Sequence, residues 1–181
     1  MDLAPALDRT FSHAHGVIAG IRPDQFDDPT PCEDWTVRDL LEHVIGVVAG
    51  MGAAAAGRSP NGGFELSDDP GAQFGEVSTA AIEAWRQPGV MEQVIEGGAG
   101  AMPGQAYASI NLLDTATHTW DLARASGQPA ELPDDVAEAA LAASHQIVSA
   151  ELRPGRFGPE IAVPDDSDAT ARLVAFLGRT P

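Results

Sequence analysis

The chain has 181 residues, 44% of them hydrophobic, which is enough for one domain with a substantial apolar core. It carries 27 Asp and Glu against 10 Lys and Arg, and a net charge of −17 argues against binding a nucleic-acid backbone. The sequence opens without a basic segment and has no apolar run of membrane-spanning length, so neither a secretory leader nor a membrane span is expected. Cys32 is the single cysteine, so no disulfide can form within the chain, which fits a reducing compartment. We therefore expect a cytoplasmic protein. One domain is expected over residues 1–181.

Helical periodicity dominates the beginning of the chain. Apolar residues three and four positions apart predict a helix over residues 2–21. The proline-rich segment 29–35 cannot be regular helix, and Thr36 followed by Asp39 forms a capping pair that predicts the start of a second helix. That helix is expected to run towards Ala56.

The centre of the chain predicts a loop, a helix and an irregular piece. Residues 57–71 are rich in glycine, proline and aspartate, so we expect a loop that could border a cleft. A third amphipathic helix is expected to follow and to end at Pro88, and residues 90–101 are expected to be irregular or extended.

Three more helices are predicted towards the C-terminus. The longest runs from Pro103, in a first-turn position, to Gly127 as its C-terminal cap. A fifth helix begins at Pro133 and ends before Pro154, and a short one spans residues 168–177. Helices of comparable length with short connections predict an all-α fold, namely a four-helix bundle with one or two additional short helices.

One motif on the fourth predicted helix concentrates the chemistry of the chain. Asp114 and His118 lie four residues apart, so on an α-helix their side chains converge on one point. His43, in the apolar pattern of the second predicted helix, could complete a three-ligand set from a facing helix. Two imidazoles and a carboxylate are typical ligands of a divalent metal with an open coordination position, with Zn²⁺ preferred and Ni²⁺ or Fe²⁺ as alternatives.

The same residues have plainer interpretations. Asp114 and His118 could form only a hydrogen-bonded helix pair, and His43 could be a partly buried histidine with a satisfied ring. Asp121 shares the face of the motif, so it could accept a hydrogen bond from a ligand or act as a general base. It could equally pair with Arg124, three residues further on.

The other histidines, the tryptophans and the cysteine predict mainly structural roles. His13, His15 and His145 are expected to be structural or exposed. The three tryptophans are expected to line the core or a groove, with Trp120 a candidate for the wall of the site. Cys32 could be a reactive thiol near the site, or a buried cysteine in a tight turn.

Four blocks of the sequence resemble a known family. They are residues 29–43, 114–125, 157–159 and 172–179. Together they are similar to the actinobacterial metal-binding family related to the N-terminal domain of mycothiol-dependent maleylpyruvate isomerase, within the DinB/YfiT-like four-helix-bundle superfamily. The resemblance implies a DinB/YfiT-like bundle in which His43, Asp114 and His118 are the metal ligands. Related members carry His or Glu at the position of Asp114, whose shorter side chain must ligate from a nearer backbone or through water.

The resemblance also implies a function. We expect a metal-dependent S-transferase or isomerase that acts on small electrophiles with a low-molecular-weight thiol such as mycothiol, because a bound metal stabilises a thiolate. Asp121 would be the catalytic residue, orienting a ligand. A metal-dependent hydrolase and a non-enzymatic bundle that binds a metal or small ligand remain open alternatives. The expected partner is a small-molecule substrate, and the chain could form a homodimer; no nucleic acid and no membrane are expected as partners.

Overall fold

Helices make up most of the structure, a computed structural model that describes residues 2–59, 64–98 and 100–181. In chain order the helices are α1 Leu3–Ala19, α2 Val37–Ala55, α3 Pro70–Trp85, α4 Gly104–Ser126, α5 Asp134–Ile147 and α6 Ala169–Phe176. A 3₁₀ turn, Pro23–Gln25, follows α1. Within the described ranges, no helix is both long enough and apolar enough to cross a membrane.

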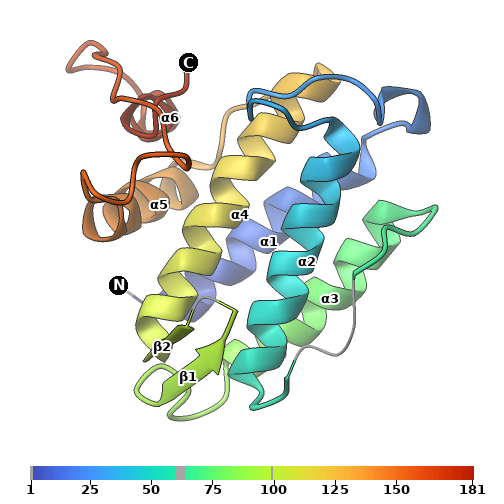
Figure 1. Ribbon diagram of the computed structural model, residues 1–181, viewed down its shortest axis with the longest axis vertical. Helices are drawn as coiled ribbons and strands as arrows, with labels where there is room; N and C mark the ends of the chain where they lie inside the picture. Colours follow the sequence, from blue (N-terminus) through green and yellow to red (C-terminus); the bar gives the residue numbers. More distant parts are fainter. Residues whose placement is uncertain (1, 60–63, 99) are drawn as a thin grey trace.

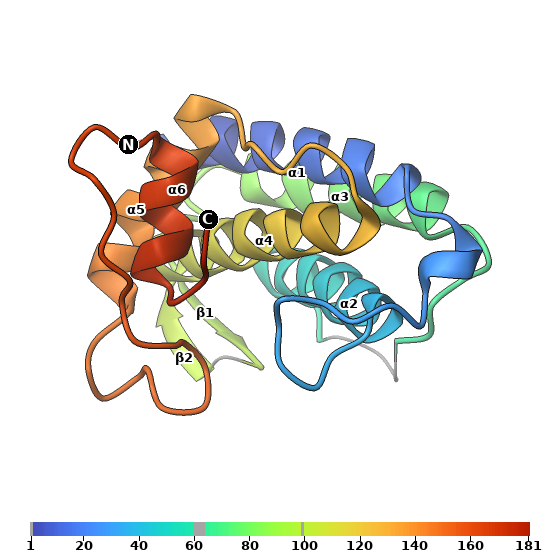
Figure 2. The ribbon, with the colours of Figure 1, turned by 90° about the horizontal axis from the view of Figure 1, so that it is seen from above.

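The first four helices form the bundle. Helix α1 packs against α3 and α4, and α2 packs against the same two helices, so the order around the bundle is α1, α3, α2, α4 (Figure 1). Helix α5 packs against α4 and α1, and α6 packs against α5, which places the pair to one side of the bundle (Figure 2). The predicted all-α four-helix bundle is therefore confirmed, with α5 and α6 as the additional helices.

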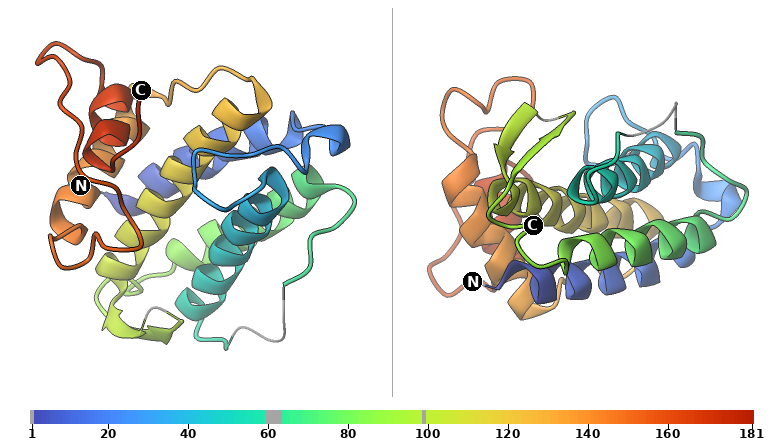
Figure 3. Two further views of the ribbon diagram at one scale, coloured as in Figure 1. Left: turned by 45° about the horizontal axis from the view of Figure 1, so that its top comes forward. Right: turned by 90° about the horizontal axis from the view of Figure 1, so that it is seen from below.

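A short antiparallel hairpin lies at one end of the bundle, where α2 ends and α4 begins (Figure 3). Its strands are β1 Val94–Gly97 and β2 Gly100–Pro103. The register pairs Val94 with Pro103 and Gly97 with Gly100. Residues 90–101, expected to be irregular or extended, thus contain β1 and the first two residues of β2.

The predicted helix caps are present. The Thr36 side chain accepts a hydrogen bond from the Asp39 N–H, and the Asp39 carboxylate accepts one from the Thr36 N–H, which fixes the start of α2. At the C-terminal end of α4, Gly127 adopts a left-handed conformation with φ 70°, as a C-terminal cap requires. Pro103 and Pro133 stand immediately before α4 and α5 rather than inside them.

The fifth helix ends before Pro154, as expected. Helix α5 stops at Ile147, well before Pro154, because Val148 is extended with φ −86° and ψ 95°. The chain then turns: the N–H groups of Leu152 and Arg153 both donate to the carbonyl of Ser149. The β-branched pair Ile147 and Val148 has weak helix preference, which favours an end of the helix at this point.

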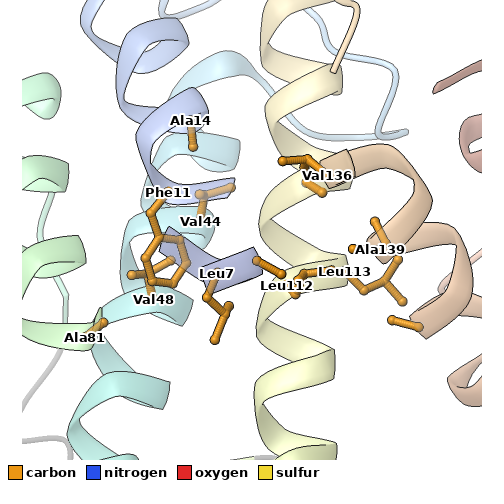
Figure 4. Packing of buried hydrophobic residues seen from close by; sticks show 14 of the residues in the cluster. Leu7, Phe11, Ala14, Val44, Val48, Ala81, Leu112, Leu113, Val136 and Ala139 are labelled. Carbon is orange, nitrogen blue, oxygen red and sulfur yellow. The ribbon is translucent and has the colours of Figure 1, made fainter. Parts of the chain in front are cut away.

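The core lies between the four bundle helices. Leu7 and Phe11 of α1 point into the interior, towards Val48 of α2 and Leu112 of α4 (Figure 4). The Phe11 ring meets Phe74 of α3 edge to face, with centroids 6.3 Å apart. Each buried Leu or Phe side chain contributes about 1.5–3 kcal/mol. The same helix packing sets the separation of α2 and α4, which carry the predicted ligands.

Two glycines of α2 differ in their surroundings. A Cβ atom on Gly52 would lie 2.6 Å from Cβ of Ala81 and 2.8 Å from its Cα, so α2 and α3 approach closely there. A Cβ on Gly50 would meet nothing within 4 Å. The pair therefore separates the effect of helix contact from that of helix propensity.

We expect Gly52→Ala to lower the free energy of unfolding by about 1–3 kcal/mol, because the helices must move apart to admit the methyl group. The matched variant Gly50→Ala is expected to raise it by up to about 1 kcal/mol, since alanine favours a helix interior. Urea unfolding measures both. A shift in the same direction for the two variants would contradict the close approach of α2 and α3.

Candidate metal centre

The three predicted ligands lie together at the contact of α2 with α4. His43 is on α2, and Asp114 and His118 are one turn apart on α4. Asp114 Oδ2 is 3.1 Å from His43 Nε2 and 3.6 Å from His118 Nε2. One ligand atom from each residue lies within 4.8 Å of the other two. Ligands on a tetrahedral Zn²⁺ at about 2.0–2.1 Å are about 3.3 Å apart, so these spacings suit a common cation.

Asp114 has an atom that the protein itself leaves unsatisfied. Its Oδ1 is buried and has no hydrogen-bond partner among the described residues. A buried carboxylate oxygen without a partner costs free energy, and bound ions are one reason why such atoms occur. Although Asp114 has a short side chain, its Oδ2 already lies near both imidazoles, so direct ligation would need no longer residue. The donor set and the unpartnered oxygen both fit a divalent cation.

The far side of the His118 ring faces a buried carboxylate. His118 Nδ1 donates to Asp121 Oδ2 at 3.0 Å. Asp121 is fully buried, and the Arg179 guanidinium donates to both of its oxygens, from Nε to Oδ1 at 2.8 Å and from Nη2 to Oδ2 at 2.7 Å. Because Nδ1 carries the proton in this contact, Nε2 is the His118 nitrogen that faces Asp114 and is available to a cation.

Arg179 also determines which group of side chains can hold a cation. Cys32, His118 and Asp121 form a second set with metal-ligand spacing. Arg179 Nη2 lies 3.6 Å from Cys32 Sγ, so a positive charge already occupies this second set. A further cation would be repelled there. His43, Asp114 and His118 are therefore the better candidate centre.

The turn before α2 supplies a wall of the centre. The Thr30 hydroxyl accepts a hydrogen bond from the Cys32 N–H, and the Trp35 N–H donates one to the Cys32 carbonyl. Cys32 and Trp35 are therefore held on one turn. This turn belongs to the blue segment that leads into α2 in Figure 3. The Trp35 ring lies 4.8 Å from that of His43 and 6.2 Å from that of His118, between centroids. One indole thus lies beside both imidazoles.

One of the alternatives weighed from the sequence is wrong. Asp121 pairs with Arg179 and not with Arg124, whose guanidinium lies 5.4 Å above the Trp120 ring. The tryptophan that contacts the two site histidines is Trp35, and Trp120 is buried.

The other histidines stand apart from this group. His13, His15 and His145 belong to neither cluster with metal-ligand spacing among the described residues. The His145 ring instead packs against Phe176, at 4.5 Å between centroids.

Sequence patterns do not single out Arg179. It lies 58 residues after Asp121, so no helical spacing connects the two. The one signal available is its place at the end of the block 172–179 that resembles the family. A fully buried aspartate requires a cationic partner, but which of the chain's arginines supplies it depends on the tertiary fold.

Exposure falls across the centre in one direction. The side chains of His43 and Asp114 are 29% and 22% exposed, that of His118 is 14% exposed, and that of Asp121 is fully buried. The centre is therefore closed on the Asp121 side and reached by solvent from the His43 side. A small molecule would approach a bound cation from α2.

The charges in the centre shift several pKa values. Burial lowers the pKa of His118, but the Asp114 charge and the hydrogen bond to Asp121 outweigh it and raise this pKa to about 10. Burial raises the pKa of Asp114, yet the His118 charge and the hydrogen bond from His43 bring it below its usual value. The pKa of Asp121 is lowered too, against its burial, by hydrogen bonds from His118 and Arg179. Without a cation, His118 is therefore protonated near neutral pH.

We expect the metal-free protein to lose stability as the pH rises from about 6.5 to 10. Below 6.5 His118 is protonated in the folded and unfolded states, and above it only the folded state keeps the proton, until the pH reaches the folded pKa of about 10. The contribution of this one group is at most about 1.4 kcal/mol per pH unit. Unfolding free energies of chelator-treated protein across this range measure it. His118→Gln should remove the difference and the exposed His15→Gln should retain it; identical profiles for both variants would contradict the assignment.

Comparisons with known proteins agree with the sequence resemblance. A family model described as the mycothiol maleylpyruvate isomerase N-terminal domain matches residues 9–123. Two uncharacterised proteins of Mycobacterium tuberculosis, MT0763 of strain CDC 1551 and Rv0738 of another strain, are each 36% identical over 182 residues, covering 99% of this chain and 99% of their own.

Two crystal structures are more distant. They are those of the mycothiol-dependent maleylpyruvate isomerase and a histidine-to-alanine mutant of it, with 15% and 14% identity and TM-scores of 0.48 and 0.49. Each match covers 77% of this chain and 66% of the isomerase chain. The predicted relation thus rests on the family model and is confirmed by it. This chain belongs to the family of the mycothiol maleylpyruvate isomerase N-terminal domain.

Proposed function

We propose that this protein is a metal-dependent enzyme in which a low-molecular-weight thiol such as mycothiol attacks a small electrophile, as in an S-transferase or a thiol-assisted isomerase. The observation that carries the proposal is the convergence of His43, Asp114 and His118 around a buried, unpartnered carboxylate oxygen. The thiol is supported by family membership, because the family model is named after a mycothiol-dependent reaction.

Zn²⁺ is the cation that two imidazoles and a carboxylate suit best, with Ni²⁺ and Fe²⁺ as alternatives. When bound, it would supply a thiolate near neutral pH by lowering the pKa of a coordinating thiol. The protein's own side chains hold and orient the reactants. Trp35 offers an apolar wall beside both imidazoles, and the exposed side at His43 gives the substrate its approach.

Asp121 is proposed to orient His118 rather than to transfer a proton to substrate. Its two oxygens are engaged by His118 Nδ1 and by Arg179, and the side chain is fully buried. A carboxylate in this position fixes the ring of a metal-ligating histidine and increases its basicity. Because mycothiol-type co-substrates are reduced thiols, the same proposal assigns the protein to the reducing cytoplasm.

The metal part of the proposal predicts one Zn²⁺ per chain in protein that has been loaded with zinc and desalted. His43→Ala and His118→Ala each remove a proposed ligand and should lose stoichiometric zinc. His15→Ala is the matched control, because His15 is exposed and outside the cluster. Elemental analysis of the four proteins gives the result. Zinc that persists in both ligand variants, or that never binds the unsubstituted protein, would rule out this centre.

The thiol part of the proposal predicts turnover that requires metal and thiol together. Zinc-loaded protein, mycothiol and a panel of small electrophiles such as α,β-unsaturated carbonyl compounds should show conversion of the electrophile, and a chelator should stop it. The thiol is consumed if the reaction is an S-transfer and is recovered if it is an isomerisation. Product formation without thiol would instead favour a hydrolase, in which the metal activates water. Stoichiometric zinc without any turnover across the panel would favour a binding protein and contradict the enzymatic proposal.

A further inference from the structure

The carboxylate behind the centre receives a second, charged partner from the end of the chain. Arg179 makes a two-point contact with Asp121, Nε to Oδ1 and Nη2 to Oδ2. The Arg179 side chain is only 10% exposed, and that of Asp121 is fully buried. Bidentate arginine–carboxylate pairs of this kind are strong and directional, because the planar guanidinium fits the two oxygens in one orientation.

We infer that Arg179 is a positioning residue of the metal centre, which holds the Asp121 carboxylate in the orientation that accepts the His118 Nδ1–H. Asp121 Oδ2 receives both Arg179 Nη2 and His118 Nδ1. Rotation of the carboxylate would therefore break both contacts together. With Arg179 in place, the His118 ring is fixed and its Nε2 is presented to the cation. The inference rests on the proposed metal site and adds a residue to it.

The C-terminal segment is built to present Arg179. Leu177 is fully buried, and after α6 the N–H of Arg179 donates to the Val174 carbonyl at 2.9 Å. Gly178 has φ +85°, and a Cβ there would lie 2.5 Å from Cα of Gly158, so only glycine fits this reversal without strain. These contacts fix the direction of the backbone immediately before Arg179.

A second arginine ties the same region together. Arg153 Nη1 donates to the carbonyl of Gly158 at 2.8 Å and to that of Phe176 at 2.9 Å. The segment against which Gly178 packs is thereby joined to the end of α6. The family model ends at residue 123, so α5, α6 and Arg179 lie outside the matched region. The part of the chain beyond that match thus reaches back to the ligand helix α4.

A merely structural role for Arg179 makes a different prediction. If the residue only fastened the C-terminus, its loss would lower stability and leave the affinity of the intact fold for zinc unchanged. If it acts through Asp121, its loss must weaken zinc binding, and it must do so only while the Asp121 carboxylate is present. Zinc affinity and the protonation pattern of the His118 ring therefore distinguish the two roles.

The experiment compares zinc dissociation constants, from competition with a chromogenic chelator, for full-length unsubstituted protein, Arg179→Gln and Arg179→Lys. We expect Arg179→Gln to bind zinc about 10- to 100-fold more weakly, the range for loss of a group behind a metal ligand. Arg179→Lys keeps the charge without the two-point contact and should fall between the two. Arg172→Gln is the matched control on α6, since Arg172 pairs with Glu138 away from the centre, and should bind normally.

A double variant tests whether the effect passes through Asp121. Asp121→Asn alone and Asp121→Asn with Arg179→Gln should show the same zinc affinity, because the second change has no carboxylate left to act on. Nitrogen-15 NMR of zinc-loaded protein should show a protonated His118 Nδ1 in the unsubstituted protein and an altered Nδ1 signal in Arg179→Gln.

The outcomes distinguish the role of Arg179 from the existence of the metal site. Unchanged zinc affinity in Arg179→Gln, or additive losses in the double variant, would overturn the role of Arg179 while leaving the metal site intact. If Arg179→Gln fails to fold, Arg179→Lys decides the question: normal zinc affinity in it overturns the inference. No zinc binding by the unsubstituted protein would instead defeat the proposed function itself.

Discussion

The structure depends above all on the pairing of one fully buried carboxylate, that of Asp121. Removing such a charge from water costs several kcal/mol unless it is paired and hydrogen-bonded. One partner, His118, comes from the same helix, and the other, Arg179, comes from the far end of the chain. Satisfying Asp121 therefore requires α4 and the segment after α6 to be in place together. The same requirement leaves His118 Nε2 facing Asp114 and α2.

The packing of the bundle helices holds the other two candidate ligands next to His118. Helices α2 and α4 are neighbours in the bundle, and the core residues on their inner faces hold them at contact distance (Figures 1 and 4). His43 and Asp114 stand at the more exposed edge of this contact and His118 lies deeper. The centre thus joins a closed side, where charges are paired within the protein, to an open side, where a ligand can approach. An open metal position needs both features.

Much of this arrangement could be predicted from the sequence, because it depends on local rules. Apolar spacing predicts the bundle helices to within a few residues, and the Thr36 and Gly127 caps act through their own backbone neighbours. The approach of Asp114 to His118 follows from helix geometry alone. That His43 faces them required the family resemblance, since periodicity does not say which helices are neighbours.

The rest depends on contacts between distant segments. The position of Trp35 beside the two imidazoles and the partner of Asp121 are both decided by tertiary packing. Arg124 was the local candidate for Asp121, three residues away, and the fold instead uses an arginine 58 residues away. Spacing along a helix cannot decide which arginine pairs with Asp121, because the helix forms equally well with either partner.

The central claim is that His43, Asp114 and His118, and no sulfur from the protein, surround one cation. Zinc K-edge X-ray absorption of the zinc-loaded protein, recorded without added thiol, tests it most directly. We predict that the zinc has nitrogen and oxygen neighbours at about 2.0–2.1 Å, with the multiple-scattering pattern of two imidazoles. A sulfur neighbour at about 2.3 Å would place the cation with Cys32 instead, and would contradict the proposed centre.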